Sequence, residues 1–387
     1  MNKKFIALVL IVIAVFAISG CLSKPKTEST PMGAFVGGTS GLGVAFMANA
    51  PASEYPECTE FEADVQLENK GEYTIPTGKA TIYLSGISTS AYGIKVNDVS
   101  ANKAGTSGEL TGKQKFGTST TPGGRDVIAF SSTKGSPDFP GDTTQTLIAT
   151  ACYPYETTSM STICVQENFA KQTTGGSELC KISGDKTVYN AGAPVQVSAL
   201  TQFPIGSKPI TGITVNLKLR DAGGGTAIRS GATCPSVDQK DVGRITVKEM
   251  KLINLGVHGD CENTGKNIVT ITGGEGFLTC RFDWSAQQKA GEIKGTFEDI
   301  LQMKFDYDYT QSTTTKVKFL NMPEGNCAET APASTGGAVA CTGNDETPCC
   351  PKELARAAAA QAAPDIPADC KCSNNVCTSG CNVAKCR

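Results

Sequence analysis

The feature that most constrains the fold is a strict alternation of apolar and polar residues in short runs. Every second residue from Phe61 to Leu67 is apolar, and the same holds from Ile213 to Leu219. Because successive side chains of a strand point to opposite faces, each run predicts a strand with one buried face. Runs this short and evenly spaced predict an all-β chain of β-sandwiches rather than an α/β fold.

Two segments resemble each other enough to suggest an internal repeat. In Val65–Gly71 and in Leu217–Gly223, an alternating strand leads into a polar residue and then a glycine. We therefore expect two versions of one sandwich unit in tandem, over residues 33–168 and 181–322. Residues 323–387 are expected to form a small disulfide-rich tail that includes a short alanine-rich helix.

The amino terminus has the pattern of an export signal. Lys3 and Lys4 precede an uncharged apolar run, and a basic head before an apolar segment is typical of secretory signals. The letters "ISGC" ending at Cys21 also resemble a lipobox, in which the cysteine is lipidated and the chain is cut just before it. We expect a signal peptide over residues 1–20 and a polar, lipidated tether over residues 21–32. The alternatives are an uncleaved membrane anchor and a secreted chain cut elsewhere.

The charge of the chain excludes one class of partner. The net charge is -2 and becomes -4 if Lys3 and Lys4 leave with the signal. Without a basic field, nucleic acid is not an expected partner.

The chain has 17 cysteines. In an exported chain we expect most of them to form disulfides, because that compartment does not keep thiols reduced. With Cys21 set aside for lipid, seven lie in the sandwich region and nine in the tail. Either one bridge joins the two groups or each group keeps a free thiol. The expected disulfide cysteines are Cys58, Cys152, Cys164, Cys180, Cys234, Cys261, Cys280, Cys327, Cys341, Cys349, Cys350, Cys370, Cys372, Cys377, Cys381 and Cys386.

Spacing does not define how these cysteines are connected. We single out Cys261 with Cys280, because the residues between them look like a short hairpin. The neighbours Cys349 and Cys350 are expected to join different partners, since a ring between adjacent cysteines is strained. Zinc binding by the tail cysteines is the alternative, but structural zinc sites favour C-x2-C spacings.

The strand-and-glycine unit at Val65–Gly71, with its echo at Leu217–Gly223, resembles the CARDB type of domain of bacterial and archaeal surface proteins. The stretch from "GGTSGLGVAFMANAP" to "GFLTCRF" is also similar to uncharacterised exported proteins of small-genome archaea. This resemblance implies immunoglobulin-like sandwiches at the cell envelope, and it assigns no catalytic residues. The cysteine-rich tail departs from the pattern.

A glycine-rich stretch near the start has the spacing of a nucleotide-binding motif. Gly37, Gly41 and Gly43 follow the G-x-x-x-G-x-G pattern of short-chain dehydrogenases, where the glycines lead into a helix. Here the following residues read as a strand and then a loop broken by proline. We therefore expect a flexible entry into a first strand.

Two aspartates on one strand are candidates for a site. Asp306 and Asp308 alternate with aromatic residues and should lie about 7 Å apart on one face. Paired carboxylates could hold calcium or act as the acid and base of a glycosidase, and a solvated strand face is the more frequent role. No calcium-binding loop motif accompanies them.

Three aromatic residues complete the candidates. His258 is the only histidine, and we expect a turn residue rather than a general base. Tyr153 and Tyr155 share a strand face and suggest either an aromatic binding platform or buried core residues.

We conclude from the sequence that the chain is a lipid-anchored protein of the cell envelope with a structural, adhesive or protein-contact role. It is expected to be extracytoplasmic and to lack catalysis and cofactors. Its expected partners are the membrane, which it contacts through an N-terminal lipid or anchor, and other proteins at the cell surface. The alternatives are an extracytoplasmic ligand- or ion-binding lipoprotein and an extracellular hydrolase using Asp306 and Asp308.

Overall fold

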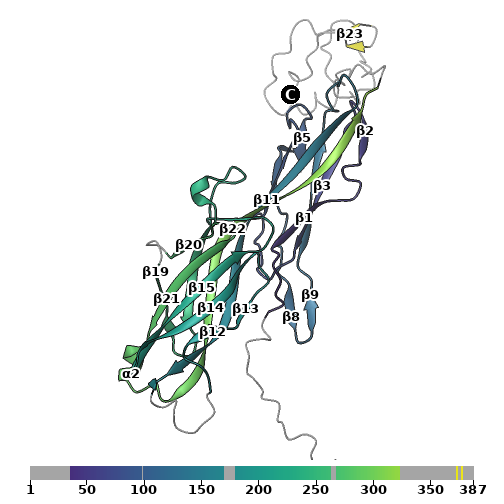
Figure 1. Cartoon of the computed structure of the whole chain (residues 1–387). Helices are drawn as coiled ribbons and strands as arrows, with labels where there is room; N and C mark the ends of the chain where they lie inside the picture. Colours follow the sequence, from purple (N-terminus) through teal and green to yellow (C-terminus); the bar gives the residue numbers. More distant parts are fainter. Residues whose placement is uncertain are drawn as a thin grey trace, which may run out of the picture. The chain divides into compact units, whose positions relative to one another are not determined.

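The structure is a computed structural model that describes residues 35–97, 99–169, 179–262 and 267–322, with two short strands in the tail. Contacts divide the chain into two units, Met1–Pro323 and Glu324–Arg387. The described part is almost entirely β-structure, which confirms the predicted all-β class (Figure 1). Its α-helix is the short α2 (Ser285–Lys289), in keeping with the absence of long helical patterns between Tyr55 and Leu320 of the sequence.

Two outer sheets of five strands each carry the alternating patterns seen in the sequence. The first outer sheet has the order β1 (Leu42–Phe46), β3 (Glu62–Asn69), β10 (Arg125–Ser132), β5 (Ile94–Val96) and β6 (Val99–Ser100). The second outer sheet has the order β12 (Gly184–Lys186), β14 (Val195–Gly206), β15 (Ile210–Asp221), β21 (Glu275–Asp283) and β19 (Asp260–Glu262).

Both outer sheets pack against one shared sheet of ten strands. Its central path is β18 (Val257–His258), β17 (Arg244–Leu252), β22 (Thr296–Leu320), β11 (Thr143–Gln166), β4 (Thr81–Ser85) and β7 (Lys103–Gly105). Four further strands join it, namely β2 (Glu54–Pro56), β13 (Val188–Asn190), β16 (Thr226–Ile228) and β20 (Ile268–Thr270). Two separate pairs are β8 (Gln114–Phe116) with β9 (Ser119–Thr121) and β23 (Cys372–Ser373) with β24 (Val376–Cys377).

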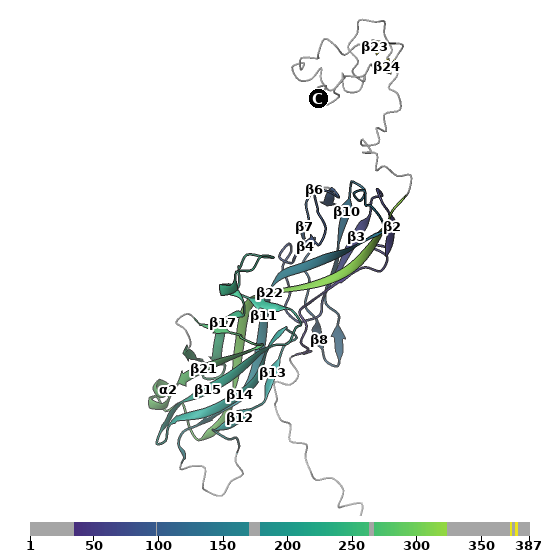
Figure 2. The same cartoon turned by 45° about the horizontal axis from the view of Figure 1, so that its top comes forward.

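The strands β11 and β22 run through both sandwiches (Figures 1 and 2). They pair antiparallel along all 24 residues of β11, a length of about 80 Å at the usual rise of a strand. Their alternate side chains are buried along nearly the whole length. The sandwiches predicted over residues 33–168 and 181–322 are therefore joined by a continuous sheet. The end of β11 lies in the second sandwich, and the end of β22 lies in the first.

The exchange of strands is visible in the core contacts. On β11, the hydroxyl of Tyr153 lies under the first outer sheet, whereas the backbone of Cys164 is bound by Gln202 of the second. On β22 the order is reversed, since Phe319 near its end packs on Phe61 beside the first outer sheet, with ring centroids 5.9 Å apart. Each long strand thus begins in one sandwich and ends in the other.

The two halves correspond strand by strand. The strands β1, β3, β10 and β5 hold the places that β14, β15, β21 and β19 hold in the second outer sheet. The register agrees as well, because Leu42 lies opposite Asn69 in the first sheet and Val195 lies opposite Asp221 in the second. The internal repeat suggested by the sequence is therefore an approximate two-fold relation that exchanges β11 with β22.

We predict that the two halves hold together without a continuous backbone. A protease site placed between β11 and β12 should be cut without separating the halves, because β11 and β22 remain paired and buried in both sandwiches. The Cys152–Cys234 and Cys164–Cys180 disulfides join residues on opposite sides of a cut within residues 167–178, so the cleaved protein should be reduced under native conditions before gel filtration. Co-elution at the volume of the intact chain is expected, and separation into two folded halves would contradict the strand exchange.

Candidate functional site at the junction of the two sandwiches

Four tyrosines of the long strands meet where the two sandwiches join. Tyr153 pairs with Tyr309 and Tyr155 pairs with Tyr307 in adjacent registers. The ring centroids are 5.8 Å apart in the first pair and 6.4 Å apart in the second. All four rings are buried, at 1% exposure or less. Aromatic pairs in such contact each contribute about 0.5–1.5 kcal/mol beyond the area they bury.

The hydroxyl of Tyr155 is fixed by the first repeated motif. It donates to Asn69 Oδ1 at 3.3 Å, and the Gly71 N–H donates to the same oxygen at 3.2 Å. Asn69 follows directly from the alternating strand, so its side chain is carried to the junction by β3. A Cβ on Gly71 would collide with the Tyr155 hydroxyl, which explains the glycine two residues later.

The second motif fixes Tyr309 in the same way. The Tyr309 hydroxyl donates to Asp221 Oδ1 at 2.8 Å, and the Gly223 N–H donates to that oxygen at 3.3 Å. A Cβ on Gly223 would lie 2.6 Å from the Tyr309 hydroxyl. In each motif, the polar residue accepts a hydrogen bond from the hydroxyl of one tyrosine of a long strand, and the glycine leaves room for that hydroxyl.

The other two hydroxyls hold the first strand of each outer sheet. Tyr153 accepts the Leu42 N–H at 3.1 Å, and Tyr307 accepts the Val195 N–H at 3.2 Å. Because these contacts lie at corresponding positions, the junction has the same hydrogen bonding on both sides of the two-fold relation.

Burial raises the pKa of all four tyrosines above the ordinary value of 10.0. The neutral phenol is therefore the form present at physiological pH, and it acts as a hydrogen-bond partner rather than a nucleophile. The odd-numbered residues in the middle of β11 face the outer sheets and are buried. The interpretation of Tyr153 and Tyr155 as an aromatic binding platform is therefore wrong, and their interpretation as buried core residues is confirmed.

The candidate carboxylates lie on the opposite face of the shared sheet. Asp308 pairs with Pro154 between the two tyrosine pairs, and Asp306 pairs with Glu156 one step further along. Lys248 of β17 forms an ion pair with Glu156. In the described ranges, no group of three or more His, Cys, Asp or Glu residues gathers to hold a metal.

A loop of the second half covers Asp308. The segment after β16 approaches the shared sheet, and the Gly231 N–H donates to Asp308 Oδ2 at 2.9 Å. The Cys152–Cys234 disulfide joins this loop to β11. Burial is the main cause that raises the pKa of Asp308, and the charge of Asp306 adds to it. The two aspartates thus have different surroundings, which the alternation in the sequence did not indicate.

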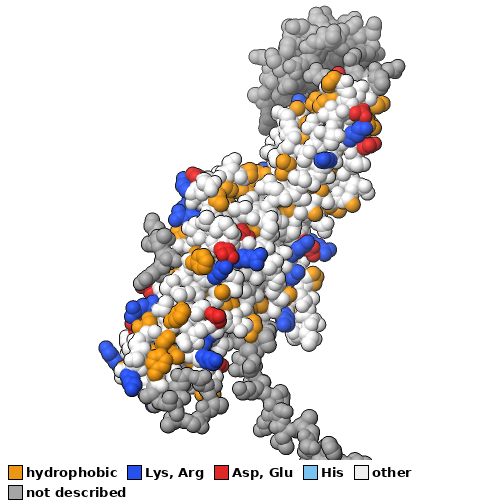
Figure 3. Space-filling view, viewed as in Figure 1, with side chains coloured by type: hydrophobic (Ala, Val, Ile, Leu, Met, Phe, Trp, Pro, Cys, Tyr) orange, Lys and Arg blue, Asp and Glu red, His pale blue; other side chains and the backbone are white. Residues whose placement is uncertain are grey.

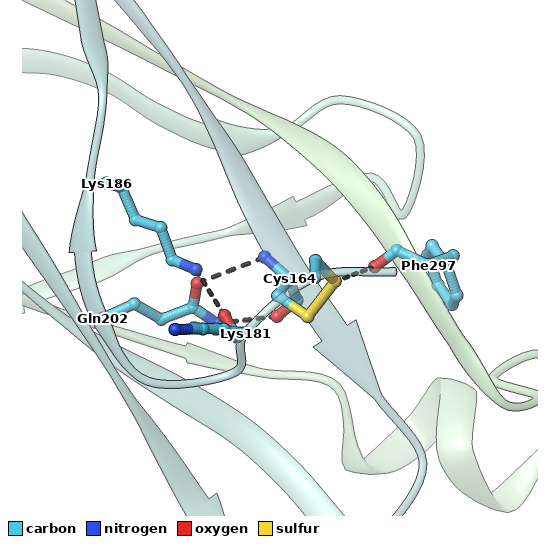
Figure 4. The surroundings of a disulfide bond; sticks show 6 residues. Cys164, Lys181, Lys186, Gln202 and Phe297 are labelled. Atoms are coloured by element: carbon cyan, nitrogen blue, oxygen red, sulfur yellow. Dashed lines mark hydrogen bonds between the residues drawn. A yellow bond between two sulfur atoms is a disulfide. The ribbon is translucent and has the colours of Figure 1, made fainter. Parts of the chain in front are cut away.

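Two more bridges stabilise the second half. Cys164 on β11 bonds to Cys180, and Figure 4 shows the Gln202 side chain reaching the backbone of Cys164 beside this bridge. The structure also joins the pair singled out from the sequence, Cys261 and Cys280, whose Cα atoms are 4.0 Å apart. They lie opposite each other on β19 and β21.

The residues between Cys261 and Cys280 do not form a simple hairpin, because β20 leaves to pair with β17. Cys58 is also disulfide-bonded, and the six cysteines just described are already paired with one another. This arrangement of bridges indicates an oxidising, extracytoplasmic compartment.

The remaining sequence candidates fall into two groups. Gly43 lies in β1 with Gly41 just before it, so the glycine-rich stretch enters a strand as expected. His258 lies in the short strand β18, where it pairs with Lys251, so the expectation of a turn residue is wrong. Cys21, the alanine-rich helix and the bridges of the tail lie outside the described residues. Among the residues that are described, no helix is long and apolar enough to cross a membrane.

Replacing Gly71 with alanine should destabilise the chain by about 1–3 kcal/mol, because the added methyl overpacks the junction. The matched control is Gly108→Ala, where a Cβ would meet nothing within 4 Å. Urea unfolding of both variants measures the difference. Equal stability of the two variants would contradict the role of Gly71 in seating Tyr155.

The raised pKa of Asp308 predicts a pH-dependent effect. A carboxyl whose folded pKa lies above its ordinary 3.8 favours folding when protonated and opposes folding once the pH exceeds the folded pKa. Asp308→Asn keeps an acceptor for Gly231 and should therefore be more stable than the parent at pH 7. The difference should disappear below about pH 3, as measured by urea unfolding across pH.

The control for this prediction has the opposite sign. The hydrogen bond from Lys318 holds the pKa of Asp142 below its ordinary value. Asp142→Asn should therefore be slightly less stable than the parent at pH 7, with the difference lost at low pH. If Asp308→Asn behaved like this control, the burial of Asp308 would not govern its titration.

Comparisons with known proteins add little to this picture. No family model and no curated protein matches the chain. Among solved structures, a crystal structure of collagen adhesin from S. aureus aligns at 10% identity over 73% of this chain and 92% of that chain. Its TM-score is 0.08, and a superposition of that quality carries no argument about fold or function.

Proposed function

We propose that the chain is a lipid-anchored, non-catalytic protein of the cell envelope with a structural, adhesive or protein-contact role. The observation that carries this proposal is the shared sheet. Two sandwiches with β11 and β22 in common are joined by paired strands, so their outer faces keep a fixed relation. A fixed display of two sheet faces suits contact or support rather than turnover of a substrate.

The side chains of the junction support a non-catalytic role. The tyrosine hydroxyls are engaged in holding strands together, and Glu156 is engaged by Lys248. Asp308 is covered by the loop that carries Gly231. These groups stabilise the contact between the halves, which is the work expected of a structural protein.

The place where the described chain begins is compatible with anchoring through Cys21. The Gly37 N–H donates to Glu72 of the first half at 2.6 Å, and Gly38 accepts the Ala193 N–H of the second half at 3.2 Å. A tether ending here would hold both halves at their junction. Together with the envelope resemblance of the repeated motif, this supports a protein displayed at the membrane surface.

The anchoring part of the proposal is tested with Cys21→Ser. In membrane fractionation, the parent should remain in the membrane pellet and release into detergent, whereas the variant should lose the lipid-dependent retention. Mass spectrometry of the amino-terminal peptide should find a lipid-modified Cys21 in the parent. An unmodified peptide from a parent that stays soluble after lysis would show that the anchor is wrong.

A further inference from the structure

The two ends of the shared sheet can be compared residue by residue. Thr157 of β11 donates to the Val195 carbonyl at 2.7 Å, and Gln311 of β22 donates to the Leu42 carbonyl at 2.6 Å. Leu42 and Val195 hold the same place in the two outer sheets, since a tyrosine hydroxyl binds the N–H of each. Thr157 and Gln311 are therefore equivalent, and the residues that follow them on β11 and β22 are equivalent in turn.

A strand of the second half closes the side of its sandwich. β13 pairs antiparallel with β11 from Ser159 to Ser161. Both serines are buried, and their hydroxyls donate to Asn190 at 2.6 Å and to the Thr187 carbonyl at 2.9 Å. The Asn190 side chain also bonds the N–H and the carbonyl of Val197 on β14, at 3.0 and 3.1 Å. One extended segment thus satisfies the edges of both sheets.

The equivalent place in the first half is open. Thr313 and Thr315 of β22 stand where the two serines stand in β11, but they are partly exposed, and their hydroxyls form no hydrogen bond within the described chain. On the side of β22 away from β11, β16 pairs as far as Thr310 and β2 pairs from Lys318 onward. None of the described strands pairs with residues 311–317 on that side. The described part of the shared sheet therefore lacks an equivalent of β13 here.

Backbone groups of β22 point into this place. The Lys318 N–H lies on this side of the strand, because it donates to the Ser53 carbonyl at 2.8 Å. Backbone direction alternates along a strand, so Ser312, Thr314 and Lys316 present their N–H and carbonyl groups on the same side. Across residues 35–97, 99–169, 179–262 and 267–322, these groups have no partner there.

The first outer sheet contributes Val44 of β1. The N–H and carbonyl of Leu42 point away from β3, where side chains of the long strands bind them. Those of Val44 point the same way two residues later. Val44 is the equivalent of Val197, but nothing in the described ranges bonds its backbone on that side. We call residues 312–316 of β22 together with Val44 the open edge.

The segment equivalent to β13 runs elsewhere. By the same register, residues 35–37 are the equivalents of β13. The Gly37 N–H donates to Glu72 at 2.6 Å, and a Cβ on Gly37 would lie 3.8 Å from the Asn190 carbonyl oxygen. These residues therefore lie beside the second half and do not pair with β22. A strand for the open edge has to come from outside the described residues.

We propose that the open edge binds an extended segment of a partner protein, which pairs with β22 as β13 pairs with β11. A strand edge with unpaired N–H and carbonyl groups is a template for such strand addition. β13 defines the chemistry of the segment, which is a short extended run of β-branched or aromatic residues followed by a side-chain carboxamide in the place of Asn190. The carboxamide would bond the backbone of Val44, and the hydroxyls of Thr313 and Thr315 would donate to the segment.

Backbone pairing rather than charge carries this recognition. On the side of the molecule seen in Figure 3, acidic and basic side chains are interspersed, so no single-sign field selects a strongly charged partner. So short a contact should be weak by itself. Anchoring of both proteins in one membrane would strengthen it by raising their effective concentration. The inference rests on the proposed protein-contact role and names the surface that makes the contact.

The test uses a synthetic peptide with the sequence of residues 186–192, KTVYNAG, and the chain from residue 22 onward with its disulfides intact. NMR follows the hydrogen exchange of each amide. Peptide at about ten times its dissociation constant should slow the exchange of the Ser312, Thr314 and Lys316 amides about tenfold. The amides between them point to β11 and should change little. The peptide with Asn190→Ala should bind several-fold more weakly.

Two matched variants at one position isolate the backbone pairing. Thr314→Pro removes an N–H of the open edge, and proline is tolerated on an edge strand where that N–H faces outward. Thr314→Val keeps the N–H and changes only an exposed side chain. The proline variant should lose peptide binding, whereas the valine variant should bind like the parent. If Thr314→Pro perturbs folding, Thr313→Val/Thr315→Val removes the two hydroxyls instead and should weaken binding several-fold.

Three results would overturn the proposal. The first is a parent that fails to bind the peptide, or in which the amides of Thr158 and Met160 beside β13 respond instead. The second is binding that survives Thr314→Pro, the loss of the two hydroxyls or the loss of the peptide's asparagine, or that is lost in Thr314→Val. The third is slow exchange at the open edge without peptide. If it is independent of protein concentration, the chain's own tether fills the edge, and if it rises with concentration, a second copy does.

The failure of this contact and the failure of anchoring are distinguishable. The chain from residue 22 onward lacks Cys21, so peptide binding is measured without the membrane. A Cys21 that carries no lipid would leave the peptide result unchanged, and an open edge that binds no peptide would leave the membrane fractionation unchanged.

Discussion

The pairing of β11 with β22 is the interaction on which the rest of the structure depends. Hydrogen bonds run along all 24 residues of β11, and the alternate side chains of both strands form the floor of both sandwiches. Removing either strand would open the two cores at once. The stability of each sandwich is therefore inseparable from that of the other, although each has its own outer sheet.

The junction shows how a short repeated motif keeps this arrangement in register. Asn69 and Asp221 each accept a tyrosine hydroxyl and a glycine N–H. A shift of the long strands by one residue would turn every tyrosine to the opposite face and leave these acceptors unpaired. Polar groups at the buried junction thus specify register, whereas the apolar residues supply most of the stabilising burial.

The two halves have diverged around this common frame. In the second half, a longer connection after β15 carries Cys234 and covers Asp308, and a disulfide between Cys261 and Cys280 joins paired strands. The corresponding place in the first half holds the buried pair Val96 and Phe130. The corresponding strands β3 and β15 differ in their outward residues as well, with Gln66 and Glu68 in the first where the second has Lys218 and Arg220.

The sequence by itself determined the strands, their buried faces and the presence of a repeat. Alternation from Phe61 to Leu67 names the buried residues because side-chain direction is a local property of a strand. The cysteines indicated the compartment. Cys261 was paired with Cys280 because a short hairpin was expected between them, and the bridge is present although β20 pairs with β17 instead. Local sequence patterns did not indicate which strands are shared by the two sandwiches.

Tertiary structure alone decided that β11 and β22 pair along their whole length, because partners far apart in sequence leave no local signal. It decided for the same reason that Tyr153 and Tyr155 are buried and that Asp308 is covered. An exposed and a buried strand face carry similar alternation until the opposing sheet is known. The roles of Asn69 and Asp221 depend on their contacts with Tyr155 and Tyr309. These tyrosines are distant in the sequence, so only the tertiary structure shows the contacts.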